Sequence, residues 1–298
     1  MGECIFCARN AGWFKDRHPE CERRHSEAWP AMVQLAAEAA AGSSEVGSLT
    51  ERLSDIARSS HRPHTDVQRA LIAGWRRALD AALEDDLLTE EEEAPLRTYA
   101  DRFGFTWQGL RQLRENLQTS GTEATQSDVA SEAFHALQRF ELAMALRDVL
   151  EGRAPRNVDL CDATAFNLKG GEQLVWSFDF TDYYELRTKR EYIGGYQGVS
   201  VRVARGLYYR VGGFRGRPVE TEQMEYMDSG SFGITTHHIY FVGSTKALRI
   251  PYAKVISLVP HEDGVGVHRE TGRLQLFETG KDTGWFVYNV ISNLGPLG

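Results

Sequence analysis

Residues 230–269, GSFGITTHHIYFVGSTKALRIPYAKVISLVPHEDGVGVHR, decide the fold of the C-terminal part of this chain. β-Branched and aromatic residues gather in four short groups, at 239–242, 248–250, 255–259 and 265–267. Glycine, proline, serine and aspartate separate these groups, and such residues are typical of turns. The pattern therefore predicts four consecutive strands that form an antiparallel meander.

Strand signals also occur upstream of this meander. LVWSFDF at 174–180 predicts a strand, and the alternation of Val199, Val201 and Val203 with polar or small residues predicts another. LYYRVG follows after Gly206 and precedes GGFRGRP, which we interpret as a glycine-rich turn at 212–216. At the other end, residues 283–294 predict a short helix whose apolar side carries Phe286, Val290 and Leu294.

The order of these motifs resembles a known class of domain. A strand reading "IT..HIYFVG", a strand ending in "IPY.KVISL" and a "DGV.V.R" hairpin are similar to bacterial pleckstrin-homology-like (PH-like) and GRAM-like domains. The resemblance covers roughly residues 168–294. It implies an antiparallel, β-barrel-like sheet with the C-terminal helix closing one open end, and it suggests a binding module.

Residues 187–217 are strongly basic. They contain eight basic residues and one acid, Glu191, and acidic residues follow from Glu220 to Asp228. Two interpretations are open: ion pairs between strands of one sheet, or a site for an anionic partner. The candidate binding residues are Arg202, Arg205, Arg210, Arg215 and Arg217. We expect Arg215 and Arg217 at the glycine-rich turn, where a guanidinium group can bind phosphate or carboxylate bidentately.

The N-terminus carries a metal-ligand pattern. Cys4, Cys7, Cys21 and His25 form C-x2-C-x13-C-x3-H, and four such ligands satisfy tetrahedral zinc without an open position, which is typical of a structural site. His18 is an alternative fourth ligand. We favour His25 because its spacing places it on the same helical face as Cys21. Cys161 is distant in sequence, and we interpret it as a buried apolar residue.

The middle of the chain reads as helical. A helix is predicted from Thr65, and another from Thr89 to Phe103, with four glutamates in its first turn and Gly104 after its end. We predict a polar loop at 119–127 and a further helix at 128–152. ALEDDLLTEEEEAPLRTYADRFGF, at 82–105, resembles the helical hairpin of tellurite-resistance TerB-like domains.

Composition and charge limit the class of protein. The net charge of −8 argues against general affinity for nucleic acid. No secretory signal pattern and no apolar run of about 20 residues occurs, which favours a cytoplasmic protein without a transmembrane segment. We predict a multidomain α+β chain: a zinc knuckle at 1–28, an all-α TerB-like domain at 29–152, and a PH-like or GRAM-like β domain at 166–298.

Motifs for catalysis do not occur in the sequence. We find no nucleophile elbow, phosphate loop, H-E-x-x-H or dinucleotide fingerprint. We therefore expect a non-enzymatic bacterial adaptor, associated with stress or defence, that recognises a protein partner or an anionic membrane face through its C-terminal domain. The alternative is a nucleic-acid-associated regulator or phage-defence component that uses the zinc knuckle and the basic strands. An enzyme of unrecognised type is the third hypothesis.

Overall fold

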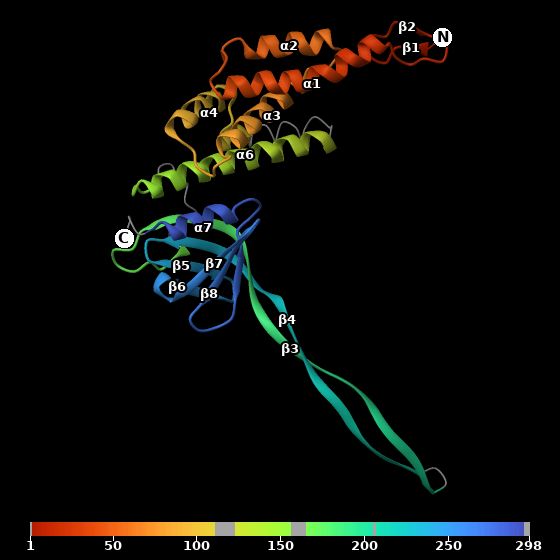
Figure 1. The fold of residues 1–298 in the computed structure, drawn as a ribbon, viewed down its shortest axis with the longest axis vertical. Coiled ribbons are helices and arrows are strands. Elements are labelled where there is room, and N and C mark those ends of the chain that lie inside the picture. The colour runs from red at the N-terminus through yellow and green to blue at the C-terminus, as the bar shows by residue number, and fades with distance from the viewer. Residues whose placement is uncertain (1, 111–122, 156–164, 205–206, 295–298) are drawn as a thin grey trace. The chain divides into compact units, whose positions relative to one another are not determined.

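The computed structural model describes residues 2–110, 123–155, 165–204 and 207–294, without the side chains of residues 123–130 and 190–220. The chain divides into two compact units, Met1–Arg156 and Asn157–Gly298. The first unit consists of helices preceded by a small hairpin, and the second is a curled antiparallel sheet with a helix (Figure 1). The mixed α and β character predicted from the sequence is confirmed.

The first unit begins with the hairpin of β1 (Gly2–Glu3) and β2 (Asn10–Gly12). The helices of this unit are α1 (Pro19–Ala40), α2 (Leu49–Ser59), α3 (Thr65–Ala82), α4 (Glu90–Phe103) and α6 (Glu123–Leu150). Helix α1 begins at Pro19 with Glu20 and Glu22 in its first turn, since proline and acids both favour a helix start. The helix continues to Ala40 and so crosses residue 28, where we predicted the boundary between a zinc knuckle and a helical domain. That boundary stays a prediction.

Local signals set the ends of α4 as the sequence predicted. Glu92 N donates to Thr89 Oγ1 at 3.3 Å, and Thr89 N donates to Glu92 Oε2 at 3.0 Å, so the two residues form a capping box. Gly104 follows the helix with φ of 70°. The loop predicted at 119–127 is wrong in its second half, because α6 is already helical at Glu123. Its first half, 119–122, lies outside the described residues.

Trp75 lies at the centre of the helical core. Its side chain is fully buried and its Nε1 donates to the carbonyl of Leu96 at 3.1 Å, which satisfies the one polar atom of the indole. The rings of Phe105 and Phe140 pack against it at centroid distances of 5.3 and 5.8 Å. These contacts join α3 and α6 to the segment that follows α4.

The second unit contains a seven-stranded sheet with the order β6-β5-β4-β3-β9-β8-β7, and every ladder is antiparallel. Its strands are β3 (Leu174–Ala204), β4 (Leu207–Thr235), β5 (His238–Gly243), β6 (Ala247–Pro251), β7 (Val255–His261), β8 (Gly264–Arg269) and β9 (Gln275–Glu278). The sheet curls into a half-barrel, and α7 (Gly284–Ser292) packs against β7 and β8 (Figure 1). The four strands predicted within residues 230–269 are confirmed as β5–β8, but they do not form one meander, because β6 and β7 lie at opposite edges of the sheet and only β5 with β6 and β7 with β8 are paired.

Aromatic side chains fill the interior of the half-barrel. Tyr183 on β3 stacks on Phe277 on β9, with ring centroids 5.0 Å apart and an interplanar angle of 15°. From α7, Phe286 contacts Trp176 at 5.2 Å and Phe178 at 6.0 Å. The predicted apolar side of this helix is therefore the side that faces the sheet.

Strands β3 and β4 continue far beyond the rest of the sheet (Figure 1). Strand β9 pairs with β3 only at residues 182–185, and β5 pairs with β4 only at residues 230–234. From Leu186 on β3 and Met224 on β4 to the far end of the hairpin, the two strands pair with each other and with no other described strand. We call this two-stranded segment, residues 186–204 and 207–224, the β-ribbon.

The β-ribbon corrects one prediction. The glycine-rich segment 212–216 is not a turn but lies within β4, where Gly212 pairs with Gly198 and Gly216 pairs with Gly194. Glycine within a strand pattern can mark a close approach of backbones as well as a turn. The glycine content of residues 212–216 therefore does not distinguish a turn from a paired strand.

Candidate metal centre

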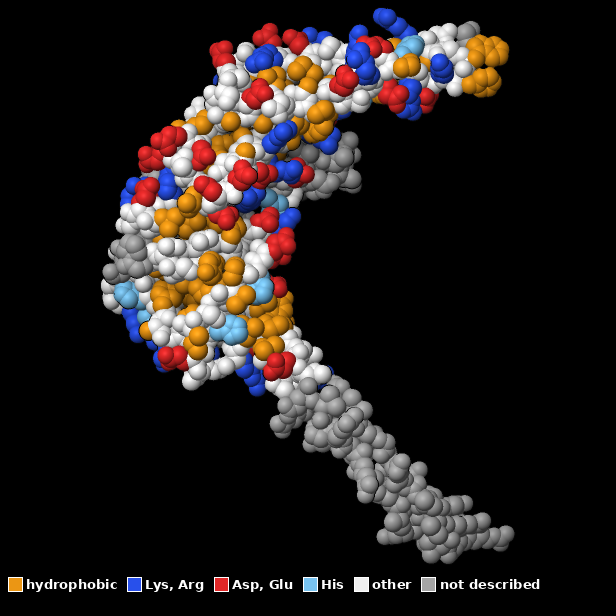
Figure 2. Space-filling view, in the orientation of Figure 1, with side chains coloured by type: hydrophobic (Ala, Val, Ile, Leu, Met, Phe, Trp, Pro, Cys, Tyr) orange, Lys and Arg blue, Asp and Glu red, His pale blue; other side chains and the backbone are white. Residues whose placement is uncertain are grey.

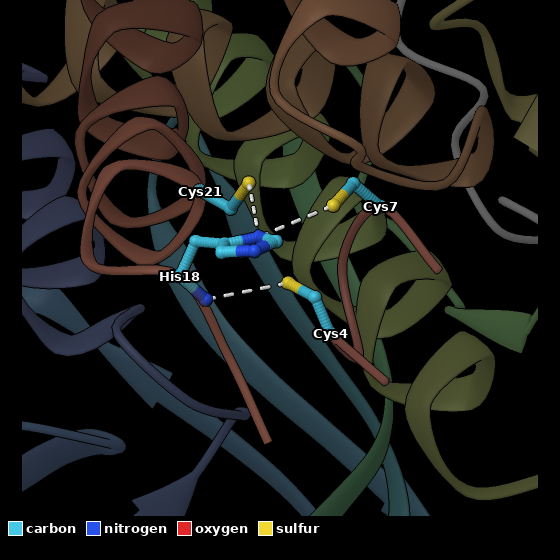
Figure 3. A group of neighbouring side chains, drawn as sticks. All are labelled: Cys4, Cys7, His18 and Cys21. Carbon is cyan, nitrogen blue, oxygen red and sulfur yellow. Dashed lines mark hydrogen bonds between the residues drawn. The ribbon is translucent and has the colours of Figure 1, made fainter. Parts of the chain in front are cut away.

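Three cysteines and one histidine meet at the N-terminus of the first unit. The ligand atoms of Cys4, Cys7, His18 and Cys21 all lie within 4.8 Å of one another. Their side chains point toward a common centre (Figure 3). Among the residues that the structure describes, this is the one such group of metal-ligating side chains. The arrangement could bind a metal ion.

The first two cysteines are placed by a tight turn next to the β1–β2 hairpin. Cys4 N donates to the carbonyl of Arg9 at 2.8 Å, and Ala8 N donates to the carbonyl of Cys4 at 2.8 Å. Ala8 adopts a left-handed conformation with φ of 55°, which turns the chain back after Cys7. The C-x2-C spacing therefore folds into a loop that directs both thiols to one side.

The other two ligands come from the start of α1. His18 is the N-cap residue of this helix, and Cys21 lies in its first turn. The backbone N–H of His18 donates to Cys4 Sγ at 3.4 Å, which joins the helix start to the loop of the first two cysteines. The helix end and the loop thus hold each other in place around the cluster.

The ring of His18 is oriented by a hydrogen bond on its far side. His18 Nε2 lies 3.0 Å from the carbonyl oxygen of Asn10, and a carbonyl can only accept, so Nε2 carries the proton. This leaves the lone pair on Nδ1, which lies 3.4 Å from Cys7 Sγ and 3.8 Å from Cys21 Sγ. Such a backbone partner is typical of histidines that bind metals, because it fixes both tautomer and ring orientation.

The thiols differ in their tendency to ionise. Burial raises the pKa of Cys4, but hydrogen bonds from the backbone amides of Cys7, His18 and Phe6 outweigh it and lower that pKa to about 6. Burial, hydrogen bonding with Cys7 and repulsion from the neighbouring thiolates raise the pKa of Cys21 to about 11. A bound cation removes this repulsion, because it attracts every thiolate in the group.

The preference for His25 as the fourth ligand is corrected by the structure. His25 Nδ1 lies 3.2 Å from the carbonyl of Ser60, and its ring packs against Phe6 at 4.6 Å. His25 therefore connects α1 to the end of α2, and His18, the alternative, lies in the cluster. The other three predicted ligands, Cys4, Cys7 and Cys21, do come together. Cys161 lies outside the described residues.

The basic residues predicted to bind a partner fall on the β-ribbon. Arg205 lies outside the described residues, and so do the side chains of the other four. In the register of the described strands, none of these four has an acidic residue directly across the ladder: Arg202 pairs with Tyr208, Arg210 with Ser200, Arg215 with Gly195 and Arg217 with Ile193. Arg187, at the base of the ribbon, does form ion pairs, at 3.7 Å with Glu185 and 3.5 Å with Glu225.

Two buried carboxylates have roles that the sequence did not predict: Glu172 was not singled out, and Asp228 was placed in the acidic run that could pair with the basic residues. Glu172 accepts hydrogen bonds from strands β4 and β5, and Asp228 accepts from the amides of Thr245 at 2.6 Å and Lys246 at 2.8 Å in the β5–β6 turn. These bonds hold the pKa of Asp228 far below its usual range. No local pattern marks either residue, since their partners are distant in sequence.

No family model matches the chain, and no curated protein matches it. Within the part of the chain that is described, no helix has both the length and the apolar character needed to cross a bilayer.

Proposed function

We propose that Cys4, Cys7, His18 and Cys21 hold a structural zinc ion. The observation that carries this proposal is the convergence of three sulfurs and His18 Nδ1 within 4.8 Å. Zinc bonds of about 2.3 Å to sulfur and about 2.05 Å to nitrogen, at tetrahedral angles, separate the ligand atoms by about 3.5–3.8 Å. The separations of His18 Nδ1 from Cys7 and Cys21, 3.4 and 3.8 Å, agree with this geometry.

The test compares two histidines in one helix. Protein purified without chelator should contain one zinc per chain by elemental analysis. His18→Ala should lose zinc to a colorimetric chelator much faster than wild type, whereas His25→Ala should retain it, because His25 bonds to Ser60 instead. Retention by His18→Ala with loss from His25→Ala would reject this ligand set.

We propose further that the chain is a non-enzymatic cytosolic adaptor whose C-terminal unit is a PH-like or GRAM-like binding module, and whose helical part is TerB-like. Three features support the module. Two antiparallel meanders, β3–β6 and β7–β9, follow each other in the chain. The first strand pairs with the last, and α7 packs on β7 and β8.

The β-ribbon is the proposed contact for an anionic protein or membrane face. Because successive residues of a strand alternate between its faces, Arg215 and Arg217 are expected on one face of the ribbon. Their register partners carry no charge that would neutralise them. A two-stranded ribbon that pairs with no further described strand needs no pocket to contact a flat anionic surface.

The corresponding experiment uses vesicles that contain phosphatidylserine and an acidic peptide as probes. Arg215→Gln/Arg217→Gln should abolish binding while changing the unfolding free energy by less than about 0.5 kcal/mol. Lys254→Gln/Lys281→Gln removes two exposed charges of the same unit outside the ribbon and is the matched control. Equal binding by all three proteins would reject the ribbon as the contact.

One observation favours the alternative, a nucleic-acid-associated regulator or phage-defence component. A two-stranded ribbon fits the major groove of B-DNA, and arginine is the commonest reader of guanine there. This function requires affinity that falls steeply with salt. A flat salt dependence for duplex binding, equal in wild type and Arg202→Gln/Arg210→Gln, would exclude it.

A further inference from the structure

The N-terminal unit carries a pair of exposed aromatic residues beside the cysteine cluster. Phe14 is 100% exposed and Trp13 is 76% exposed, and their rings contact each other at a centroid distance of 6.3 Å. We call Trp13 and Phe14 the aromatic tip. Ile5, on the neighbouring segment, is 64% exposed. Figure 2 shows hydrophobic side chains gathered at the end of the unit where β1 and β2 lie.

The backbone holds the aromatic tip outward at a conformational cost. Phe14 has φ of 61°, the left-handed region that residues with a Cβ rarely adopt. A strained residue persists only where surrounding structure imposes its conformation, and such residues concentrate at functional sites. An aromatic side chain that is both strained and fully exposed gains nothing from burial in the unit itself.

The surrounding contacts show what imposes this conformation. Ile5 N donates to the carbonyl of Asp16 at 2.8 Å, so the segment after the tip is bonded to the loop that carries the cysteines. A Cβ on Gly2 would lie 2.2 Å from the carbonyl oxygen of Lys15, which shows how closely β1 approaches the same segment. The tip is therefore presented in a fixed position by the hairpin and the cluster.

The charges around the tip favour an anionic partner. Asp16 and Arg17 pair with each other at 3.0 Å. Arg9 and Lys15 are exposed and, among the described residues, have no acidic partner, while Glu3 is the one remaining acid of this segment. Two cations thus lie in the segments next to an apolar tip.

We propose that the aromatic tip inserts into the surface of an anionic lipid bilayer, with Arg9 and Lys15 contacting the headgroups. Tryptophan prefers the membrane interface, and the aliphatic side chain of Ile5 suits acyl chains but cannot stack on a base. The two rings are inclined at 69°, so they do not form the flat platform on which successive nucleic-acid bases stack. This contact belongs to the N-terminal unit and is independent of the β-ribbon.

The test uses the full, zinc-loaded chain and sedimentation with vesicles of phosphatidylcholine, with and without phosphatidylserine. Trp13→Ser/Phe14→Ser should weaken binding to the anionic vesicles by about tenfold or more, since it removes the two aromatic groups that insertion would bury in the bilayer. Arg9→Gln/Lys15→Gln should weaken binding by about fivefold for each cation. Ile256→Ser removes an apolar side chain of similar exposure, 67%, on β7 and should have no effect.

Two further arrangements separate this contact from other effects. Zinc content is measured for every variant, so that loss of the fold is distinguished from loss of the tip, and the charge variant serves as the second probe if the aromatic variant loses zinc. The comparison is repeated in the Arg215→Gln/Arg217→Gln background, where the β-ribbon cannot mask the effect. If the β-ribbon does not bind vesicles at all, the effect of the tip variants can still be measured in that background.

A spectroscopic measurement reports the tip directly. The difference in emission between wild type and Trp13→Phe isolates Trp13, and this emission should shift to shorter wavelength on adding anionic vesicles and be quenched by brominated lipid. Unchanged Trp13 emission, or vesicle binding by Trp13→Ser/Phe14→Ser equal to wild type, overturns the proposal. The proposal is also overturned if Trp13→Ser/Phe14→Ser loses affinity for a single-stranded oligonucleotide but still binds vesicles. That result would assign the tip to nucleic acid.

Discussion

Glu172 offers a quantitative test of how the sheet unit is held together. Its side chain is 3% exposed, and the carboxylate accepts hydrogen bonds from Lys169 N at 3.0 Å, His238 Nδ1 at 2.7 Å and Tyr240 Oη at 2.8 Å, and from Thr235 Oγ1. Burial alone raises the pKa of Glu172, but these bonds outweigh it and lower the pKa from 4.5 to about 2. At about 1.36 kcal/mol per pKa unit, the ionised carboxylate contributes about 3 kcal/mol.

The sign of the pH dependence follows from this lowered pKa. Because the folded protein binds the proton on Glu172 less tightly than the unfolded chain does, the contribution is fully present above pH 4.5 and is lost as the pH falls toward 2. Glu172→Gln should therefore lower the unfolding free energy of the sheet unit by about 3 kcal/mol at pH 7 and by much less at pH 3. Tyr240→Phe, which removes one of the bonds, should cost about 1.5 kcal/mol.

Hydrogen exchange of the β4 and β5 amides measures this unit separately from the helices. Urea unfolding at pH 7 and at pH 3 gives the acid dependence. A change below about 0.5 kcal/mol for Glu172→Gln at pH 7 would show that the hydrogen bonds only compensate burial, and would refute the reasoning.

Three other predictions concern the helical unit. Cys7→Ser should reduce the zinc content and the exchange protection of residues 2–25 while leaving protection in the sheet unit unchanged, because the ligands all belong to the first unit; reduced protection in β5 would contradict this. Trp75→Ala should lower the unfolding free energy of the helical unit by about 3–5 kcal/mol in urea denaturation, since it leaves a cavity at the centre of the core; a loss below about 1 kcal/mol would show that the core refills it. Limited trypsin digestion should cut first near Arg153, in the exposed stretch after α6, and yield two stable fragments; an uncut chain would contradict it.

Helix ends and strand positions could be predicted from the sequence, because residues close together in the chain determine them. The capping box at Thr89 and the left-handed Gly104 are local features, and they set the ends of α4 correctly. Strands β5–β8 were predictable because apolar groups alternate with turn residues over a few positions. Their pairing was not, because β6 and β7 lie at opposite edges of the sheet. The β-ribbon was not predictable either, because Gly194 pairs with Gly216 and Gly198 with Gly212, and a sequence does not show which glycines are paired.

The choice between two histidines shows where spacing becomes insufficient. His18 and His25 are respectively three residues before and four residues after Cys21, so both fit one face of a helix start. The decision depends on the partners of each ring, Asn10 for His18 and Ser60 for His25, and the second of these is 35 positions away. Glu172 is similar, since its partner Thr235 lies 63 positions along the chain. Such contacts exist only after the fold has formed.

The pairing of β3 with β9 has a consequence for the order of events during synthesis. Tyr183 stacks on Phe277, so the first strand of the sheet is completed by β9, which is synthesised after the other six strands of the sheet. Contacts between distant positions slow folding, because a long loop must close before they form. Until β9 is available, β3 has an open edge that can pair with another chain. We therefore expect nascent chains that stop before Gln275 to aggregate or recruit chaperones, whereas the helical unit, translated first, can already be folded.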